Sequence, residues 1–246
     1  MRAVTEAQKE RANEVKKRLA RAMPEPKCEL EHQSAWQLLI ATILSAQSTD
    51  KGVNKVTPVL FARYPTPAAL AAAPQEDVEA IVKSTGFFRN KAKSIRETSR
   101  RIAQEHGGEV PRTLEQLIEL PGVARKTANV VLGTAYRIPS GMTIDTHAGR
   151  VSRRLGLTKQ SDPVKVERDL CELFPRTSWI DMGHRFVLHG RYVCTAQKPR
   201  CKQCPLNEHC PVREAEPESS WTKRSDQEGV RVGRRGERTS APTEGS

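Results

Sequence analysis

The chain has 246 residues, and its 41 Lys and Arg outnumber its 29 Asp and Glu to give a formal net charge of +12. This length suits one large domain or two small ones, each with a real core. No apolar run approaches the ~18 residues of a membrane span, and the polar N-terminus lacks the apolar stretch of a signal peptide. We therefore expect an intracellular protein of the cytoplasm or nucleoid.

The positive charge is unevenly distributed. From residue 211 to residue 246 the sequence has as many acidic as basic side chains, so the whole excess lies on residues 1–210. A folded body with such an excess is a candidate for nucleic-acid binding, although charge alone leaves open a merely soluble basic protein. The segment 212–246 is poor in apolar residues and is expected to be disordered.

Helices dominate the predicted elements, and strand signals are nearly absent. In chain order the long helices are predicted over residues 6–22, 35–45, 50–63, 90–106, 125–135 and 180–192, with further starts near 67, 74, 113, 145 and 163. Ser34 and Asp50 are candidate N-caps, and Thr113 with Gln116 forms a capping box. The fold class is therefore all-α.

Residues 120–131 (LPGVARKTANVV) form a tight turn between two helices. The backbone N–H groups after Gly122 are free at the positive end of the second helix, which is an anion site suited to a DNA phosphate. Gly122, Ala124 and Arg125 are thus DNA-binding candidates. An ordinary helix–helix turn is the alternative reading of Pro-Gly alone.

Lys126 and Asp145 are the candidate catalytic residues. Lys126 lies in the first turn of a helix, where the dipole disfavours the charged amine, and nucleophilic catalysis needs the neutral form. A solvated or phosphate-binding lysine is the alternative. Asp145 can accept protons and stabilise a sugar cation, or it can act only as a helix N-cap.

Cysteines cluster near the end of the predicted body with the spacing C-x6-C-x2-C-x5-C. They are Cys194, Cys201, Cys204 and Cys210. Four thiolates suit Zn²⁺ or a [4Fe–4S] cluster, and chemistry alone would favour zinc. Cys28 and Cys171 stand alone and are expected to be small buried apolar residues.

The hairpin segment, the run from Ile144 to His147 and the run from Leu44 to Asp50 together resemble the endonuclease III family of helix-hairpin-helix DNA glycosylases with AP lyase activity. The similarity extends from about residue 10 to residue 211. It implies that Lys126 is the nucleophile and that Asp145 is essential. It also implies that the four cysteines hold a [4Fe–4S] cluster, beside which Lys198 and Arg200 meet phosphates.

The resemblance further implies two α-helical domains that flank a DNA cleft. A six-helix barrel with the helix-hairpin-helix would cover residues 28–138. Residues 1–27 and 139–211 would form the iron–sulfur cluster domain, and 212–246 the tail. Lys126 and Asp145 would lie on opposite walls of the cleft.

The implied substrate is double-stranded DNA with a damaged pyrimidine or an abasic site, bound by a monomer. Gln47 and Phe87 would fill the space left by an extruded base, and Phe88 would line the pocket. The chain departs from the family pattern at Ala124, usually Gly, at Phe87, usually Leu, and at Phe88, often Tyr. Two alternatives are a monofunctional glycosylase, against which Lys126 argues, and a non-catalytic or weakly active DNA-binding protein.

Overall fold

A computed structural model describes residues 4–212, and in this range the protein is entirely helical, with no strand. The α-helices are α1 (Glu6–Ala22), α2 (Ala35–Leu44), α3 (Asp50–Arg63), α4 (Pro67–Ala72), α5 (Gln75–Val82), α6 (Phe88–Glu105), α7 (Leu114–Ile118), α8 (Arg125–Tyr136), α9 (Thr146–Arg154), α10 (Pro163–Leu173) and α11 (Trp179–Tyr192). Short 3-10 turns are η1 (Lys83–Thr85), η2 (Arg176–Ser178), η3 (Cys201–Gln203) and η4 (Asn207–His209). The all-α prediction is confirmed. The tail expected to be disordered lies, beyond residue 212, outside the described residues.

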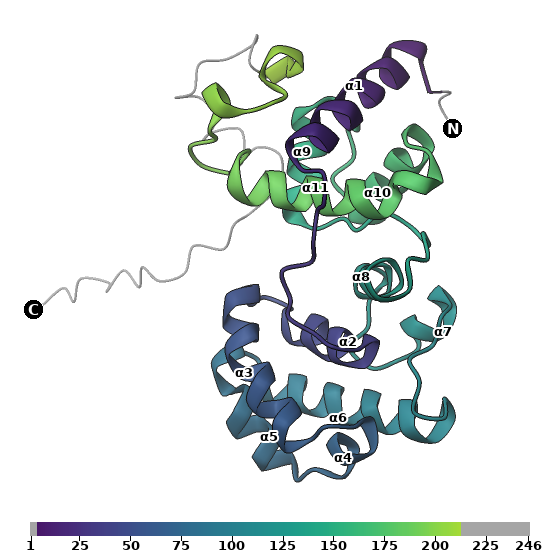
Figure 1. Cartoon of the computed structure of the whole chain (residues 1–246), viewed down its shortest axis with the longest axis vertical. Helices are drawn as coiled ribbons and strands as arrows, with labels where there is room; N and C mark the ends of the chain where they lie inside the picture. The colour runs from purple at the N-terminus through teal and green to yellow at the C-terminus, as the bar shows by residue number, and fades with distance from the viewer. Residues whose placement is uncertain (1–3, 213–246) are drawn as a thin grey trace, which may run out of the picture.

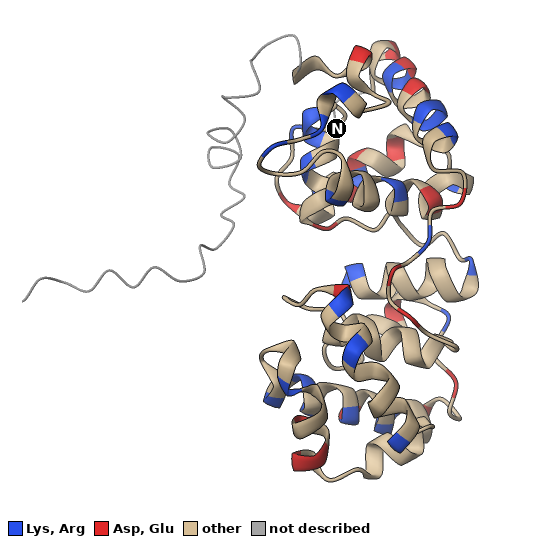
Figure 2. Ribbon diagram, turned by 60° about the vertical axis from the view of Figure 1, so that its left-hand side comes forward, with Lys and Arg blue, Asp and Glu red and all other residues tan. Residues whose placement is uncertain are grey.

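Two separate hydrophobic cores organise these helices. One core is built from α2 to α8, which we call the hairpin lobe. The other joins α1 to α9, α10 and α11, and with the segment that follows to residue 212 we call it the cysteine lobe. In Figure 1 the cysteine lobe lies above the hairpin lobe, and α8 lies between them. Lys and Arg are spread over both lobes (Figure 2).

The helix boundaries follow from capping residues, with small differences from the prediction. Ser34 caps α2 as expected. The prediction that Asp50 caps α3 is wrong. Thr49 has the extended backbone of an N-cap and its hydroxyl accepts from Gly52 N, so Asp50 is the first helical residue, and its carboxylate is bonded to Arg191. α6 begins at Phe88, two residues earlier than predicted.

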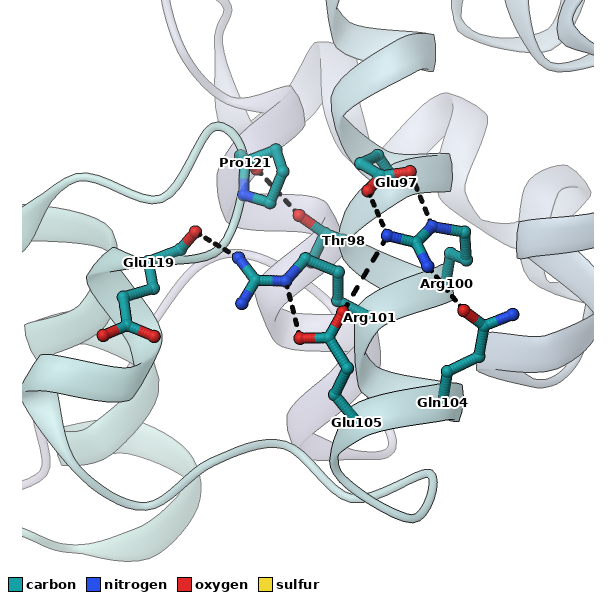
Figure 3. Close-up of polar contacts among 8 residues, drawn as sticks. All are labelled: Glu97, Thr98, Arg100, Arg101, Gln104, Glu105, Glu119 and Pro121. Atoms are coloured by element: carbon teal, nitrogen blue, oxygen red, sulfur yellow. Dashed lines mark hydrogen bonds and ion pairs between the residues drawn. The ribbon is translucent and has the colours of Figure 1, made fainter.

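Helix α6 supports the turn between α7 and α8. Figure 3 shows the Thr98 hydroxyl directed at the carbonyl of Pro121, to which it donates at 2.7 Å, and Arg101 reaching the carbonyl of Glu119 at 2.6 Å. Arg101 is itself held by Glu105 on the same helix. Carbonyls at a helix end have no partner within the helix, so these bonds fix the turn in place.

Helix α2 lies at the centre of the hairpin lobe. Eight of its ten residues are buried, as its apolar sequence predicts. Trp36 fills the interior and donates its indole N–H to Ser99 of α6 at 3.0 Å. None of the helices in residues 4–212 is long and apolar enough to cross a membrane.

Candidate active site

The hairpin turn depends on Gly122. Its φ of +77° is left-handed, and an added Cβ would lie 3.1 Å from Ser94 Cβ and 3.3 Å from Ile43 Cγ2. A side chain there would therefore be both strained and crowded. Ala124 has φ −87° and ψ 167°, which any residue adopts. The alanine that replaces the family's usual glycine thus brings no backbone strain.

Helix α8 opens with Ala124 at its N-cap, and no side chain caps it. The N–H groups of its first turn are therefore left for solvent or a ligand, at the positive end of the dipole. Lys126, the second helical residue, is exposed. This turn has the donors and the charge to bind a phosphate.

Asp145 is the N-cap of α9, and its Oδ1 accepts from Ala148 N at 2.8 Å. Within residues 4–212 its other oxygen, Oδ2, has no hydrogen bond. Asp145 is therefore a helix cap, as the alternative interpretation expected, but capping uses only Oδ1 and leaves Oδ2 available for chemistry.

A cleft of about 1620 Å³ is lined by residues from both lobes. Among the predicted site residues, those that line it are Gln47, Phe87, Ala124, Arg125, Lys126 and Asp145. Phe88, Gly122, Lys198 and Arg200 do not line it, although Lys198 and Arg200 are exposed on the cysteine loop. The chain thus brings Lys126 of one lobe and Asp145 of the other to one space.

The two neighbouring phenylalanines have different surroundings. Phe87 is 64% exposed and has a left-handed backbone, with φ 48°. Phe88 starts α6 and packs, partly buried, against the core of the hairpin lobe. Gln47 shares the unusual backbone of Phe87, with φ 54°. Two exposed side chains on separate loops are therefore held in a conformation that non-glycine residues rarely adopt.

Arg125 is engaged across the lobes. Its guanidinium donates to both oxygens of Glu167 on α10, at 2.8 and 3.0 Å, and Asn129 of α8 also donates to Glu167 at 3.0 Å. Glu167 is only 6% exposed, and bidentate pairs of this kind are strong and specific in geometry. The pair links the start of α8, which carries Lys126, to the cysteine lobe, which carries Asp145. Nothing in the sequence singled out Glu167, which looks like an ordinary solvated helix residue.

Arg191 makes a second tie between the lobes. From the end of α11 it donates to Asp50 at 2.5 Å, at the start of α3, and to Glu29. Burial disfavours the charged guanidinium, but the hydrogen bonds that it donates to these carboxylates outweigh burial and raise the pKa of Arg191. Nothing in the sequence marks Arg191 for this role either.

His147 follows Asp145 in the wall of the cleft. Burial lowers its pKa below the usual value, with the charge of Arg150 adding to the effect and that of Asp145 opposing it. Its Nδ1 lies 3.3 Å from Arg150 Nη2. Because a guanidinium can only donate, this contact requires an unprotonated Nδ1.

The four cysteines of the predicted quartet lie on the segment after α11 and line one cavity, together with Arg154 and His189. Cys194 lies just beyond the end of α11, and its N–H donates to His189 O of that helix at 2.7 Å. Arg154 donates to Cys194 Sγ at 3.3 Å. A donor of this kind stabilises negative charge on sulfur.

This donor set fits an iron–sulfur cluster. The four thiols line a common space, and four cysteine thiolates are the ligand set of a [4Fe–4S] cluster. Cys194, Cys201, Cys204 and Cys210 would hold the cluster, which would cross-link a segment whose regular structure after α11 is the short turns η3 and η4.

Known proteins share these features. A model of the HhH-GPD superfamily of base excision DNA repair proteins matches residues 40–176, and the iron–sulfur binding domain of endonuclease III matches residues 194–210. Endonuclease III of Synechocystis sp. is 51% identical over 209 residues, which span 85% of this chain and 95% of that protein.

Two solved structures are also similar, a non-covalent endonuclease III–DNA complex and a trapped endonuclease III–DNA covalent intermediate. Each matches with TM-score 0.80 and 41% identity, and the match covers 86% of this chain and 98% of the other. The likeness therefore includes both lobes and the cysteine segment.

An all-α fold with a helix-hairpin-helix at the cleft between its lobes is that of a base excision DNA repair protein. The chain belongs to the endonuclease III family. It is a DNA-binding glycosylase and AP lyase whose cysteine segment holds a [4Fe–4S] cluster. The predictions of family, fold class, enzyme class and cofactor are confirmed.

Proposed function

We propose that Lys126 is the nucleophile and Asp145 its partner in a reaction that removes oxidised pyrimidines and then nicks the strand. The observation that carries this proposal is the common cleft, which is lined by Lys126 from the hairpin lobe and by Asp145 from the cysteine lobe. A nucleophile needs a neighbouring group that manages protons and charge, and each lobe supplies one half of the pair.

The steps follow from the chemistry of an amine and a deoxyribose. Unprotonated Lys126 Nζ bonds to C1′ as the glycosidic bond breaks, and the base leaves with the bonding electrons and takes up a proton. The sugar ring then opens to a Schiff base, with O4′ receiving a proton. Loss of a C2′ proton expels the 3′ phosphate by β-elimination. Asp145 offsets the positive charge that develops on the sugar and accepts protons at Oδ2.

DNA binding is assigned to the remaining predicted residues. Gly122, Ala124 and Arg125 would bring the uncapped N-terminus of α8 to a phosphate, and Lys198 and Arg200 would meet the backbone from the cysteine segment. Gln47 and Phe87 would fill the space left by the extruded nucleotide. Phe88 is assigned to the pocket, although its ring packs against the core of the hairpin lobe.

The two lobes are proposed to be the domains expected from the sequence, the barrel over residues 28–138 and the cluster domain over 1–27 with 139–211. Action as an intracellular monomer on double-stranded DNA stays a prediction. The elution volume of the protein with and without a short lesion duplex tests the oligomeric state.

Borohydride trapping tests the nucleophile, because reduction of a Schiff base leaves the enzyme covalently attached to DNA. Lys126→Gln is expected to abolish both trapping and nicking while DNA binding stays largely intact. Lys93→Gln, an exposed lysine on α6, is the matched control and should trap normally. Continued trapping by the Lys126 variant would assign the nucleophile to another amine, and base release without trapping by the unaltered protein would indicate a monofunctional enzyme.

A further inference from the structure

A lysine is buried in the hairpin lobe without an acidic partner. Lys91 of α6 is 6% exposed, and no carboxylate within residues 4–212 forms an ion pair with it. Burial lowers its pKa. Lysines are almost never buried unpaired, since the charge loses its hydration. An apolar side chain would fill the same space at lower cost in stability. The buried amine is therefore expected to have a role other than packing.

The amine joins two loops that lie far apart in the sequence. Lys91 Nζ donates to Ser48 Oγ at 3.0 Å and to the carbonyl of Thr85 at 2.7 Å. Ser48 Oγ in turn donates to the same Thr85 carbonyl. The three groups therefore close a small network, in which each loop is bonded both to Lys91 and to the other.

Each of these loops lines the cleft and carries one of the two side chains proposed to fill the space left by the extruded nucleotide. Gln47 immediately precedes Ser48, and Phe87 comes two residues after Thr85. Both have left-handed backbones, with φ 54° and 48°. Such conformations cost free energy in non-glycine residues and persist only where the surroundings hold them.

A direct backbone link connects Lys91 to the second loop as well. Its N–H donates to Phe87 O at 3.0 Å, as the first bond of α6. The side chain then returns past this turn to Thr85. Lys91 thus fixes the loop of Phe87 from both ends and is at the same time bonded to the loop of Gln47 through Ser48.

We propose that Lys91 is a positioning residue that holds the loops of Gln47 and Phe87 at a fixed separation, so that both side chains enter the DNA together as the damaged nucleotide leaves the stack. This inference rests on the proposed function, in which these two side chains fill the vacated space. Lys91 does not line the cleft and takes no part in the bond-making steps. Its effect is therefore confined to base extrusion.

The test compares two substrates under single-turnover conditions. Lys91→Met keeps the length and volume of the side chain but removes the donors. It is expected to slow base release from a lesion duplex on the order of 10- to 100-fold, as a misplaced group does. Nicking of a preformed abasic site in single-stranded DNA, where no stack must be opened, should stay within about twofold of the unaltered enzyme. Lys93→Met, exposed on the same helix, is the charge-matched control and should leave both rates unchanged.

A double-mutant cycle separates positioning from general stability. If Lys91 acts through the Phe87 and Gln47 loops, then Lys91→Met combined with Phe87→Ala should slow base release by clearly less than the product of the two single effects. Equal slowing of both substrates, or effects that multiply in the double variant, would overturn the proposal. Should Lys91→Met fail to fold, Ser48→Ala removes the same junction without touching the buried amine, and the same two substrates decide. Failure of the proposed function is seen separately: the unaltered protein would not be trapped by borohydride, or Phe87→Ala alone would release the base at the unaltered rate.

Discussion

The two lobes bury different kinds of side chain. The hairpin lobe fills its interior with Leu, Ile, Val and Ala, and Lys91 is its one buried charged residue within the described part of the chain. The cysteine lobe has a smaller apolar core and in addition buries Arg150, Arg154, Arg185 and Glu167. The first lobe is therefore stabilised mainly by removal of apolar surface from water.

The buried arginines of the cysteine lobe share one task. Arg150 donates to the carbonyls of Gly190 and Cys194, and Arg154 to those of Thr195 and Ala196. Arg185 does the same for the end of α1, at Met23 and Pro24. These carbonyls lie at helix ends or beyond them, where no backbone donor is at hand. The cysteine lobe thus depends on charge-assisted bonds and on its cluster where regular structure is missing.

Loss of the cluster should produce the largest difference in stability between the two lobes. Cys204→Ala is expected to lower iron from about four atoms per chain and to loosen the cysteine lobe, with nicking activity lost. The hairpin lobe should keep its helices, because its core contains no ligand. Iron content and hydrogen exchange of peptides from each lobe measure this.

Cys171→Ala is the matched control for the cluster variant. Cys171 packs, partly buried, in the same lobe, and burial raises the pKa of its thiol to about 11, so it stays neutral. This variant should retain iron. Normal exchange protection of the cysteine lobe in iron-free Cys204→Ala would mean that the cluster does not support it.

Arg154→Met tests the buried arginines directly. The change leaves the partly buried carbonyls of Thr195 and Ala196 without this donor, at no more than about 1 kcal/mol each because water can reach them, and it removes the bond to Cys194 Sγ. Both stability and iron retention should fall, as seen by urea unfolding followed at the cluster absorbance.

Leu39→Ala gives the corresponding change in the other lobe. Leu39 is fully buried in α2, and its truncation should cost about 2–5 kcal/mol. Iron content should not change in the folded protein. If both variants lose iron in proportion to their loss of stability, then the lobes unfold as one unit and the contrast between them is wrong.

Asp145→Asn should affect chemistry far more than folding. Asparagine caps helices about as well as aspartate, so the free energy of unfolding should fall by less than ~1 kcal/mol. Base release should slow by about 10²–10⁴-fold if the carboxylate acts in proton transfer. Full activity in the folded fraction of a strongly destabilised variant would reduce Asp145 to a cap.

Local signals explain what could be predicted from the sequence. Helix α1 was predicted with its observed boundaries, and α2 and α8 to within a residue at each end, because caps and apolar periodicity act over a few residues. The spacing of the four cysteines is likewise a local pattern, and the cofactor followed once the family was recognised.

Contacts between distant segments explain the rest. Arg125 was expected to face DNA, and only the fold shows that Glu167, 42 residues further on, binds its guanidinium. Lys91 lies in a run of basic residues that looks solvated, and its burial depends on Ser48, 43 residues before it. Local patterns also do not tell which ring of the Phe87–Phe88 pair is exposed, because that depends on where α6 begins; the assignment of Phe87 to the wedge came from the family resemblance.

Phe87→Ala should have the smallest effect on stability. Phe87 is 64% exposed, so the free energy of unfolding should change by no more than about 0.5 kcal/mol. Stacking of an aromatic ring on a base is worth roughly 1–3 kcal/mol. Binding to a lesion duplex and base release should therefore weaken, whereas nicking of an abasic site in single-stranded DNA should change much less.

A matched control for Phe87→Ala is available on the same lobe. Ile118 of α7 is 48% exposed and does not line the cleft, so Ile118→Ala removes a similar exposed apolar group without reaching the DNA. It should leave both substrates unaffected. The melting temperature, measured together with the two activities, shows whether the Phe87 ring contacts DNA or packs in the core. A ring that belongs to the core would cost ~3–5 kcal/mol on truncation and would slow both substrates alike, and that result would remove Phe87 from the DNA-contacting surface.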